Sequence, residues 1–199
     1  METPSWQRSN PRKAPVAVPD RRVTVLGLDV DTRYIGAAIT QDGVVFATTA
    51  VRLRGRTFEE RLGALVHLMQ ATHAQALLPG GITEWPDLIA FEDRNVARNQ
   101  RTNNRLNEMV GAVKALFIAG GYAGPFVEVN AARKLAIIGL HTRYGREMLK
   151  QLTVHRVGLM CQVQGLPAPS TDHAADAVLV SRAAFMDARL GRAGLGRAV

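Results

Sequence analysis

Three carboxylate side chains, Asp29, Glu92 and Asp176, follow or lie within apolar stretches of the sequence. A carboxylate at the edge of a core is costly unless it is paired, protonated or bound to a metal. If the stretches before Asp29 and Glu92 are neighbouring strands, both side chains point into one crevice at the strand ends, where open sheets collect ligands. A final helix can then present Asp176 to this pair. Such hard oxygen ligands suit Mg²⁺ or Mn²⁺ rather than zinc, and two such ions can promote phosphodiester hydrolysis.

Each acid also has an ordinary structural interpretation. Asp29 fits a turn at the end of a strand, and Glu92 fits an ion pair with one of the arginines that follow it. Asp172 is expected to cap the last helix, because Asp after a Pro/Ser/Thr break is a common N-cap. His173 fits a surface position, and Asp176 fits a favourable interaction with the helix dipole. Spacing alone leaves both interpretations open.

Hydrophobic periodicity locates the elements that must position these residues. Strands are expected at 23–28, 34–39, 44–51, 88–91 and 126–129. Helices are expected at 57–76, 102–119, 131–138, 146–160 and 172–188. Asp42-Gly43 predicts a hairpin turn, and Thr57 with Glu60 predicts a capping box. Three antiparallel strands followed by alternating strands and helices predict an α/β fold, a mixed five-stranded sheet flanked by helices.

The two ends of the chain differ in composition from its middle. Residues 1–22 carry prolines and scattered basic side chains, and residues 188–199 alternate Arg, Gly and Ala. We expect a flexible basic arm at 1–22, one folded domain at 23–187 and a basic tail at 188–199. The net charge of +8 favours a polyanionic partner, with nucleic acid the commonest, anionic lipid its rival, and a basic solvated surface the alternative without a partner.

Cysteine usage and hydropathy set the expected compartment. Cys161 is the only cysteine, so the chain contains no internal disulfide and no zinc cluster of several cysteines. No apolar run approaches the roughly 20 residues of a membrane span, and the N-terminus lacks the apolar core of a signal peptide. We therefore expect a reducing, cytoplasmic location and no membrane partner, while an organelle transit peptide stays open.

Four motifs occur in order along the chain and carry a resemblance to a known family. They are Leu26 to Gly36 (LGLDVDTRYIG), Ile89 to Asp93 (IAFED) running on to Gly111, Ala132 to Lys134 (ARK) ahead of Gly139, and Asp172 to Ala177 (DHAADA). Over roughly residues 24–187 the chain resembles the RuvC family of Holliday-junction resolvases. The resemblance implies an RNase H-like fold.

The resemblance also implies roles for the acidic motifs. Asp29, Glu92 and Asp176 match the family's metal-binding catalytic acids, and His173 stands where the family has an Asp or a His. Residues 173 and 176 share one helix face, so His173 is expected to ligate metal or handle a proton. Asp172 takes this place if the helix register differs. The implied cofactor is Mg²⁺, two ions per site, with Mn²⁺ as a substitute.

Basic residues complete the implied site. Lys134 and Arg146 match positions that family members use near the scissile phosphate, with a solvated helix face as the alternative. A second group follows Glu92 and is expected to contact phosphates: Arg94, Arg98, Arg101 and Arg105. The family acts as a two-fold homodimer, which suits paired symmetric nicks. The dimer face is expected on the helix at 102–119, although its apolar residues fit a monomer core equally well.

Two positions depart from the family pattern. The family has Pro-Gly after its first catalytic Asp, whereas this chain has Val30-Asp31, and we interpret Asp31 as a turn residue. The family often has an aromatic residue three positions after the strand-end Glu, where this chain has Asn95. Stacking on an aromatic is worth about 1–3 kcal/mol per base. The departure therefore leaves the opening of the junction centre and the cleavage sequence undetermined.

These observations predict a metal-dependent endonuclease that resolves four-way (Holliday) junctions. One alternative is a nuclease of the same fold acting on another branched DNA, such as a flap, a fork or a transposon end. A second is an ATP-binding protein of the actin and sugar-kinase type, because Asp29-Val-Asp-Thr32 loosely matches its phosphate loop. A third is a DNA-binding module without catalysis, against which the intact set of acids argues.

Overall fold

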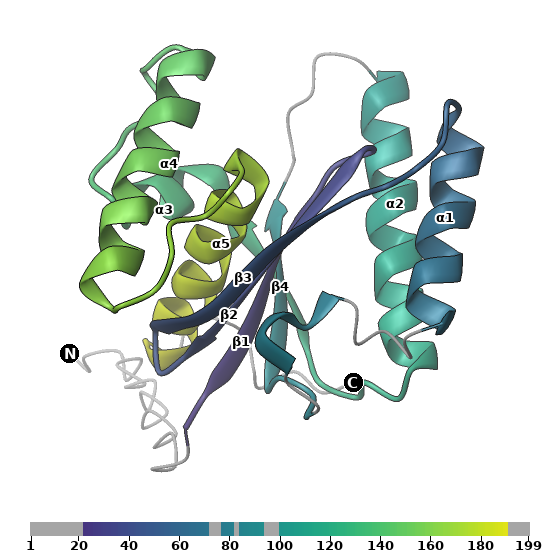
Figure 1. Ribbon diagram of the computed structural model, residues 1–199, viewed down its shortest axis with the longest axis horizontal. Helices are drawn as coiled ribbons and strands as arrows, with labels where there is room; N and C mark the ends of the chain where they lie inside the picture. Colours follow the sequence, from purple (N-terminus) through teal and green to yellow (C-terminus); the bar gives the residue numbers. More distant parts are fainter. Residues whose placement is uncertain (1–21, 72–76, 82–83, 94–99, 191–199) are drawn as a thin grey trace, which may run out of the picture.

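A single mixed sheet of five strands runs through the computed structural model, which describes residues 22–71, 77–81, 84–93 and 100–190 (Figure 1). The strands are β1 (Thr24–Val30), β2 (Tyr34–Gln41), β3 (Val44–Arg52), β4 (Leu88–Asp93) and β5 (Phe126–Asn130). Their spatial order is β3-β2-β1-β4-β5, with antiparallel pairing among the first three strands and parallel pairing of β1 with β4 and of β4 with β5. The predicted mixed five-stranded sheet is therefore confirmed.

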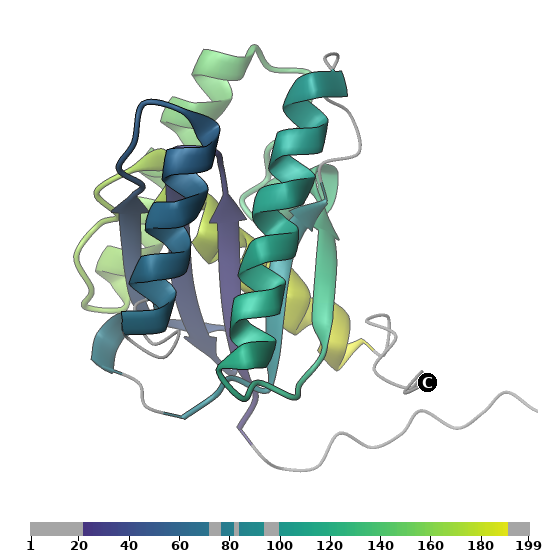
Figure 2. The ribbon, with the colours of Figure 1, turned by 90° about the vertical axis from the view of Figure 1, so that its right-hand side faces the viewer.

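Helices cover both faces of this sheet. On one face lie α1 (Phe58–Ala71) and α2 (Gln100–Ala119), which stand in front of the strands in Figure 2. On the other face lie α3 (Ala131–Ala136), α4 (Arg146–Val163) and α5 (Asp172–Arg189), and a short 3-10 helix, η2 (Pro79–Gly81), precedes β4 (Figure 1). α5 packs directly on the sheet, and α4 packs against α5. No helix among the described residues has the length and apolar content of a membrane span.

Local sequence signals explain several element ends. The β2–β3 hairpin turns through Asp42 and Gly43, whose φ angles are 51° and 78°, as its Asp-Gly sequence predicted. The predicted capping box begins α1: the Glu60 amide donates to the Thr57 hydroxyl oxygen at 3.2 Å, and the Thr57 amide donates to the Glu60 carboxylate at 3.4 Å. The prediction that Asp172 caps the last helix is wrong. Thr171 is the N-cap, and its hydroxyl accepts from the Ala174 amide.

The alternation of side chains along the strands decides which residues face α5. Leu26 and Leu28 of β1 point to the core under α1 and α2, together with Phe91 of β4. Because successive side chains of a strand point to opposite faces, Asp29 and Glu92 point to the α5 side. The apolar core on both faces thereby fixes the direction of these two acids.

Two glycines allow α5 to lie unusually close to the sheet. A Cβ atom added to Gly27 of β1 would lie 2.3 Å from the Ala177 carbonyl oxygen, and one added to Gly36 of β2 would lie 2.0 Å from the His173 carbonyl oxygen. Any larger residue at either position would push the helix away. The N-terminal half of α5 is therefore held against the middle of β1 and the start of β2.

Most of the large apolar residues of α2 belong to the core. Leu106, Met109, Val113 and Phe117 are buried beneath the sheet face that α1 also covers. Of the two interpretations offered for these side chains, the monomer core is correct. Residues 1–21 and 191–199 lie outside the described part of the chain, so the expected basic arm and tail stay predictions.

Candidate active site

The carboxylates of Asp29 and Glu92 meet at the carboxyl ends of two paired strands. Leu28 pairs with Phe91 in the parallel register of β1 and β4, and the two acids are the next residues on their strands. They line a cleft of about 830 Å³ together with Asp176 from α5. Chain segments far apart in sequence therefore bring the three predicted acids into one cavity.

Lys134 of α3 lies among these acids and is nearly buried. Its ammonium nitrogen is 2.8 Å from Glu92 Oε2 and 2.9 Å from Asp176 Oδ1. α3 follows β5 directly and begins at Asn130, whose side chain accepts a hydrogen bond from the Ala132 amide. The cap and the short helix thus carry Lys134 from the end of β5 back over β4.

His173 of α5 completes the group from the other side. Its Nδ1 lies 2.6 Å from Asp29 Oδ2, and this hydrogen bond raises the pKa of the imidazole despite partial burial. The ring of Tyr34, the first residue of β2, stacks on the imidazole with a centroid distance of 5.1 Å and an interplanar angle of 16°. Tyr34 and the Asp29 carboxylate together fix the orientation of His173.

Asp172 makes a different contact from its neighbour. Its Oδ2 lies 2.6 Å from the ammonium nitrogen of Lys150 on α4, and its Oδ1 accepts from the His173 amide. Although burial acts in the opposite direction, these hydrogen bonds and the nearby positive charges lower the pKa of Asp172. Asp172 lines the same cleft, but His173 is the residue that contacts Asp29.

The cluster carries more negative than positive charge. Glu92 and Asp176 contact one ammonium group, and although burial opposes it, the charges of Asp176 and Glu92 raise the pKa of Lys134. Burial, together with the charges of Asp29 and Glu92, raises the pKa of Asp176 to about 6. Both effects have the same origin: the acids lie close together in a partly dehydrated cleft and lack a full set of counter-charges.

The chemistry of this donor set fits a hard divalent cation. Three carboxylates and an imidazole line one cleft, and the cluster already holds a cation in the form of the Lys134 ammonium group. As these side chains stand, no three acidic, histidine or cysteine groups in the described part of the chain are arranged to ligate one ion. A cation bound at these acids would compete with the Lys134 ammonium group for Glu92 and Asp176.

The predicted phosphate-binding residues differ in their placement. Arg146, the first residue of α4, lines the cleft and is exposed. Arg101 is exposed at the start of α2, and Arg105 follows it on the same helix with its guanidinium group 5.5 Å from the centre of the Phe58 ring. Residues 94 and 98, predicted to contact phosphates, and residue 95, where the family often has an aromatic, lie outside the described residues.

Several lining residues were not predicted from the sequence. Tyr34, Arg33 and Lys150 line the cleft, and Tyr34 contacts one of the proposed catalytic side chains. Their sequence signal is weak: Arg33 and Tyr34 follow the first acid within the motif that carried the resemblance. Asp31 is a turn residue, as expected, because its Oδ1 accepts from the Arg33 amide at 3.2 Å.

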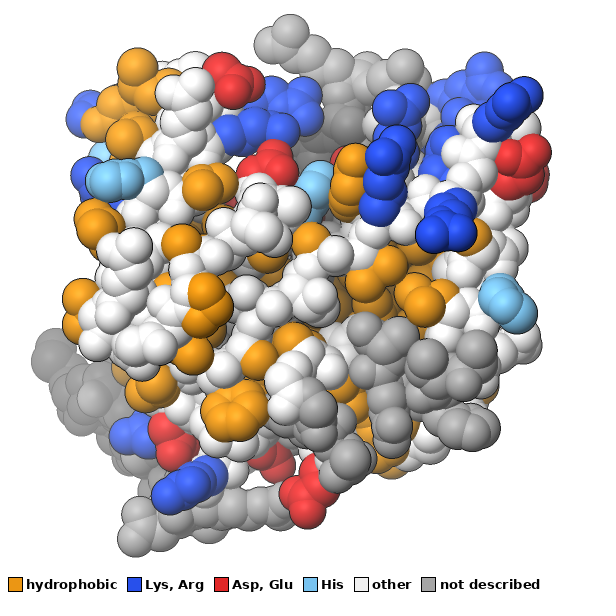
Figure 3. Space-filling view, in the orientation of Figure 1, with side chains coloured by type: hydrophobic (Ala, Val, Ile, Leu, Met, Phe, Trp, Pro, Cys, Tyr) orange, Lys and Arg blue, Asp and Glu red, His pale blue; other side chains and the backbone are white. Residues whose placement is uncertain are grey.

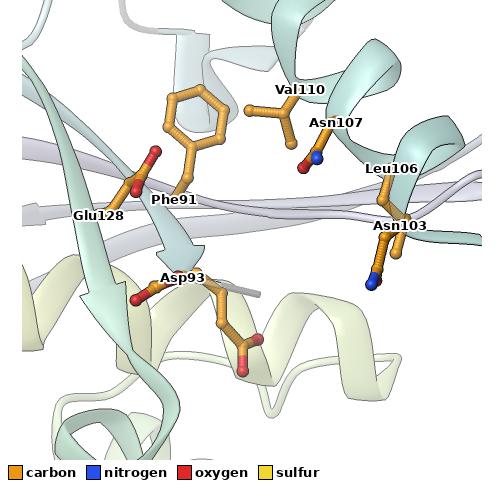
Figure 4. A pocket seen from close by; sticks show the side chains of 8 residues that line it. Phe91, Asp93, Asn103, Leu106, Asn107, Val110 and Glu128 are labelled. Atoms are coloured by element: carbon orange, nitrogen blue, oxygen red, sulfur yellow. The ribbon is translucent and has the colours of Figure 1, made fainter. Parts of the chain in front are cut away.

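A second cavity of about 220 Å³ adjoins the cleft between the strand ends and α2 (Figure 4). It shares Glu92, Asp93 and Leu106 with the main cleft. From α2, Asn103 and Asn107 face the strand ends across this cavity. Polar carboxamide groups therefore stand beside Glu92 and Asp93 on the side opposite to α5.

Three solved structures with a similar fold are Holliday junction resolvases. The structure of Thermus thermophilus RuvC in complex with a Holliday junction substrate is 17% identical, covers 86% of this chain and 98% of its own, and has a TM-score of 0.60. The chain has the fold of RuvC. A second T. thermophilus RuvC structure is 19% identical with a TM-score of 0.59, over the same shares of the two chains.

The yeast mitochondrial Holliday junction resolvase shares the RuvC fold at a greater distance. It is 15% identical, covers 84% of this chain and 81% of its own, and has a TM-score of 0.50. No protein-family model and no curated protein sequence matches the chain. The RNase H-like fold implied by the four motifs is thus confirmed from three-dimensional structure at identities below 20%.

Proposed function

We propose that this protein is a metal-dependent endodeoxyribonuclease that resolves four-way DNA junctions. One observation carries the proposal: on a RuvC fold, Asp29, Glu92 and Asp176 line one cleft, where Lys134 is the cation shared by Glu92 and Asp176. A cleft with this excess of negative charge favours divalent cations, and divalent cations are the usual means of phosphodiester hydrolysis. The resolvase structures that share the fold support a branched DNA substrate.

Asp29, Glu92, Asp176 and His173 would hold the cations, and Mn²⁺ would replace Mg²⁺. When bound, two Mg²⁺ ions would supply an activated water and neutralise charge on the leaving oxygen. The chain's own contribution is positional: Asp29 and Tyr34 orient His173, and the cleft partly excludes water from the acids. Arg146, on the rim, would neutralise the phosphate, and Lys134 would do so once it is displaced from the acids.

The proposed assembly is a homodimer, because two symmetric nicks require two sites related by a two-fold axis. The exposed side of α2 remains the proposed dimer face. Sedimentation at several protein concentrations tests this assembly. A monomer at the concentrations that cut junctions would contradict it.

The decisive experiment is cleavage of a labelled synthetic four-way junction in Mg²⁺, Mn²⁺ or EDTA, with the nicks mapped on all four strands. We expect paired nicks at symmetric positions with either metal and none in EDTA. Asp176→Asn should abolish cutting by a factor of at least about 10³ and leave junction binding nearly intact, because the carboxylate serves the chemistry rather than phosphate attraction.

A matched control removes an acid from elsewhere in the chain. Glu84 is exposed and precedes β4, at the opposite end of that strand from Glu92, so Glu84→Gln should cut like the wild type. Flaps, replication forks and linear duplexes form the comparison panel. Normal cutting by Asp176→Asn would refute the proposed active site. Equal cutting of flaps and junctions would show that the substrate is branched DNA in general rather than the four-way junction.

A further inference from the structure

A row of exposed arginines borders the cleft on the side away from α4. Arg33 lies in the turn between β1 and β2, Arg52 ends β3, and Arg54 and Arg56 lie in the loop between β3 and α1. All four are exposed. In Figure 3, Lys and Arg side chains gather at the upper right, where Figure 1 places the β3–α1 loop and the starts of α1 and α2. We call these four residues the arginine ridge.

The ridge is continuous with the site already described. Arg33 and Tyr34 both line the cleft. Arg52 pairs with Tyr34 across β2 and β3, and its guanidinium carbon lies 6.0 Å from the centre of the Tyr34 ring, which stacks on His173. A ligand bound along the ridge would therefore reach the acids without leaving the surface of the protein.

The ridge charges are not neutralised within the described part of the chain. Basic side chains elsewhere pair with acids: Lys114 with Glu128, Arg133 with Asp187, and Lys150 with Asp172. None of the ridge guanidinium groups forms such an ion pair with a described residue. Four like charges in a row repel one another unless an anion lies against them.

The backbone that carries the ridge is held in place. The amide of Leu53, which is buried, donates to the Arg33 carbonyl at 2.8 Å and joins the two segments. Arg61, also buried, donates from Nη1 to the carbonyls of Gly55 and Arg56 at 3.3 and 3.0 Å. Such preorganisation reduces the entropy that a ligand must remove on binding. Arg61 thus stabilises the loop, and the four arginines of the ridge are exposed to solvent or to a ligand.

We infer that the arginine ridge binds the phosphodiester backbone of one duplex arm of the substrate and leads that arm to the cleft. The inference rests on the proposed function. Guanidinium groups bind phosphates in bidentate fashion, and such contacts position DNA without reading its sequence. A lipid surface fits less well. Insertion into a bilayer needs exposed large hydrophobic side chains, and residues 52–57 contain none.

The test measures binding, in EDTA, of a fluorescently labelled four-way junction by the full-length protein at KCl concentrations from 50 to 200 mM. The variant is Arg54→Gln with Arg56→Gln. Each lost phosphate contact reduces the magnitude of the slope of log affinity against log salt by about 0.9, so two lost contacts reduce it by about 1.8. A fourfold rise in KCl should then cost the wild type about twelvefold more affinity than it costs the variant.

Two controls separate a local contact from a change in net charge. Lys114→Gln with Arg189→Gln removes the same formal charge away from the ridge and should keep the wild-type slope. Arg54→Lys with Arg56→Lys keeps the charge and should restore most of the slope. An unchanged salt slope in the double glutamine variant overturns the proposal that the ridge binds DNA. An equal reduction of the slope in the charge-matched control overturns it as well.

Failure of the ridge and failure of the proposed function give different results. If the wild type binds and cuts junctions while the double glutamine variant keeps its salt slope, only the ridge is wrong. If the wild type binds no branched DNA at any salt concentration, both proposals fall. Wild-type binding to phosphatidylserine vesicles that the double glutamine variant loses, with no change in DNA binding, overturns the assignment of the ridge to DNA.

Discussion

Replacing Lys134 by methionine tests whether this ammonium group is the internal counter-charge of the acid cluster. Methionine keeps an unbranched apolar chain up to the position of the lysine Cε and removes the ammonium group with its two contacts, 2.8 Å to Glu92 and 2.9 Å to Asp176. The side chains of Lys134, Glu92 and Asp176 are 7%, 17% and 25% exposed. The variant therefore leaves two largely buried carboxylates without their shared cation.

The expected destabilisation follows from this burial. Removing one partner of a buried ion pair costs about 3–5 kcal/mol, because the remaining charge stays dehydrated. The cleft admits some water to Asp176, so we expect the lower end, about 3 kcal/mol in the free energy of unfolding. The assay is urea unfolding at pH 7.5 in EDTA. Lys114→Met is the matched control, because its ion pair with Glu128 is exposed and should cost under about 1 kcal/mol.

Added Mg²⁺ should then separate the two proteins. A ligand present at 100 times its dissociation constant stabilises the folded state by about 2.7 kcal/mol. In Lys134→Met no ammonium group competes for the acids, so Mg²⁺ should stabilise the variant more than the wild type and recover much of the loss. A variant as stable as the wild type in EDTA, or equal stabilisation of both by Mg²⁺, would refute the counter-charge argument.

Two further predictions concern Tyr34 and Asp176. Tyr34→Phe keeps the ring that stacks on His173 and should cut junctions at nearly the wild-type rate. Tyr34→Leu should lower kcat about tenfold or more and shift the His173 ring protons in NMR spectra. Identical spectra and rates for the two variants would refute the positioning role of Tyr34. Asp176 has a folded pKa of about 6, above its ordinary value of 3.8, so its contribution to stability is complete below about pH 4 and is lost as the pH rises through 6. In EDTA, Asp176→Asn should therefore gain about 2 kcal/mol of stability relative to the wild type between pH 4.5 and 7.5 in urea unfolding. A constant difference over this range would contradict the assignment.

The fold and the convergence of the acids follow from information that the sequence carries locally. Alternation of apolar side chains places Asp29 and Glu92 on the same sheet face once their strands are neighbours, and helical spacing places His173 and Asp176 on one side of the last helix. The hairpin and the capping box depend on residues a few positions apart. These short-range rules predict the elements, whose ends differ from prediction by only a few residues where the structure describes them. The pairing of β1 with β4 was a condition of the argument, and the RNase H-like fold was implied by the family resemblance.

Contacts that depend on the relative placement of elements were not predictable. The sequence suggested that Lys134 lies near a phosphate, but its contact with Glu92 and Asp176 depends on how α3 turns back over β4. The stacking of Tyr34 on His173 depends on the distance between β2 and α5, which the small residue at Gly36 sets. Asp172 was expected as a cap and instead pairs with Lys150 on another helix. Each of these contacts joins elements whose packing distance no local pattern encodes.

The charges of the molecule impose an order on substrate and cation binding. The chain carries a net charge of +8, and the arginine ridge attracts a phosphate backbone toward the cleft. Inside the cleft the balance reverses, since Asp29, Glu92 and Asp176 lie close together and would repel the same backbone. A phosphate can approach the acids closely only when additional positive charge accompanies it. Cations and the scissile phosphate should therefore enter with positive coupling, each raising the affinity of the other, because each neutralises the charge that opposes the other's binding.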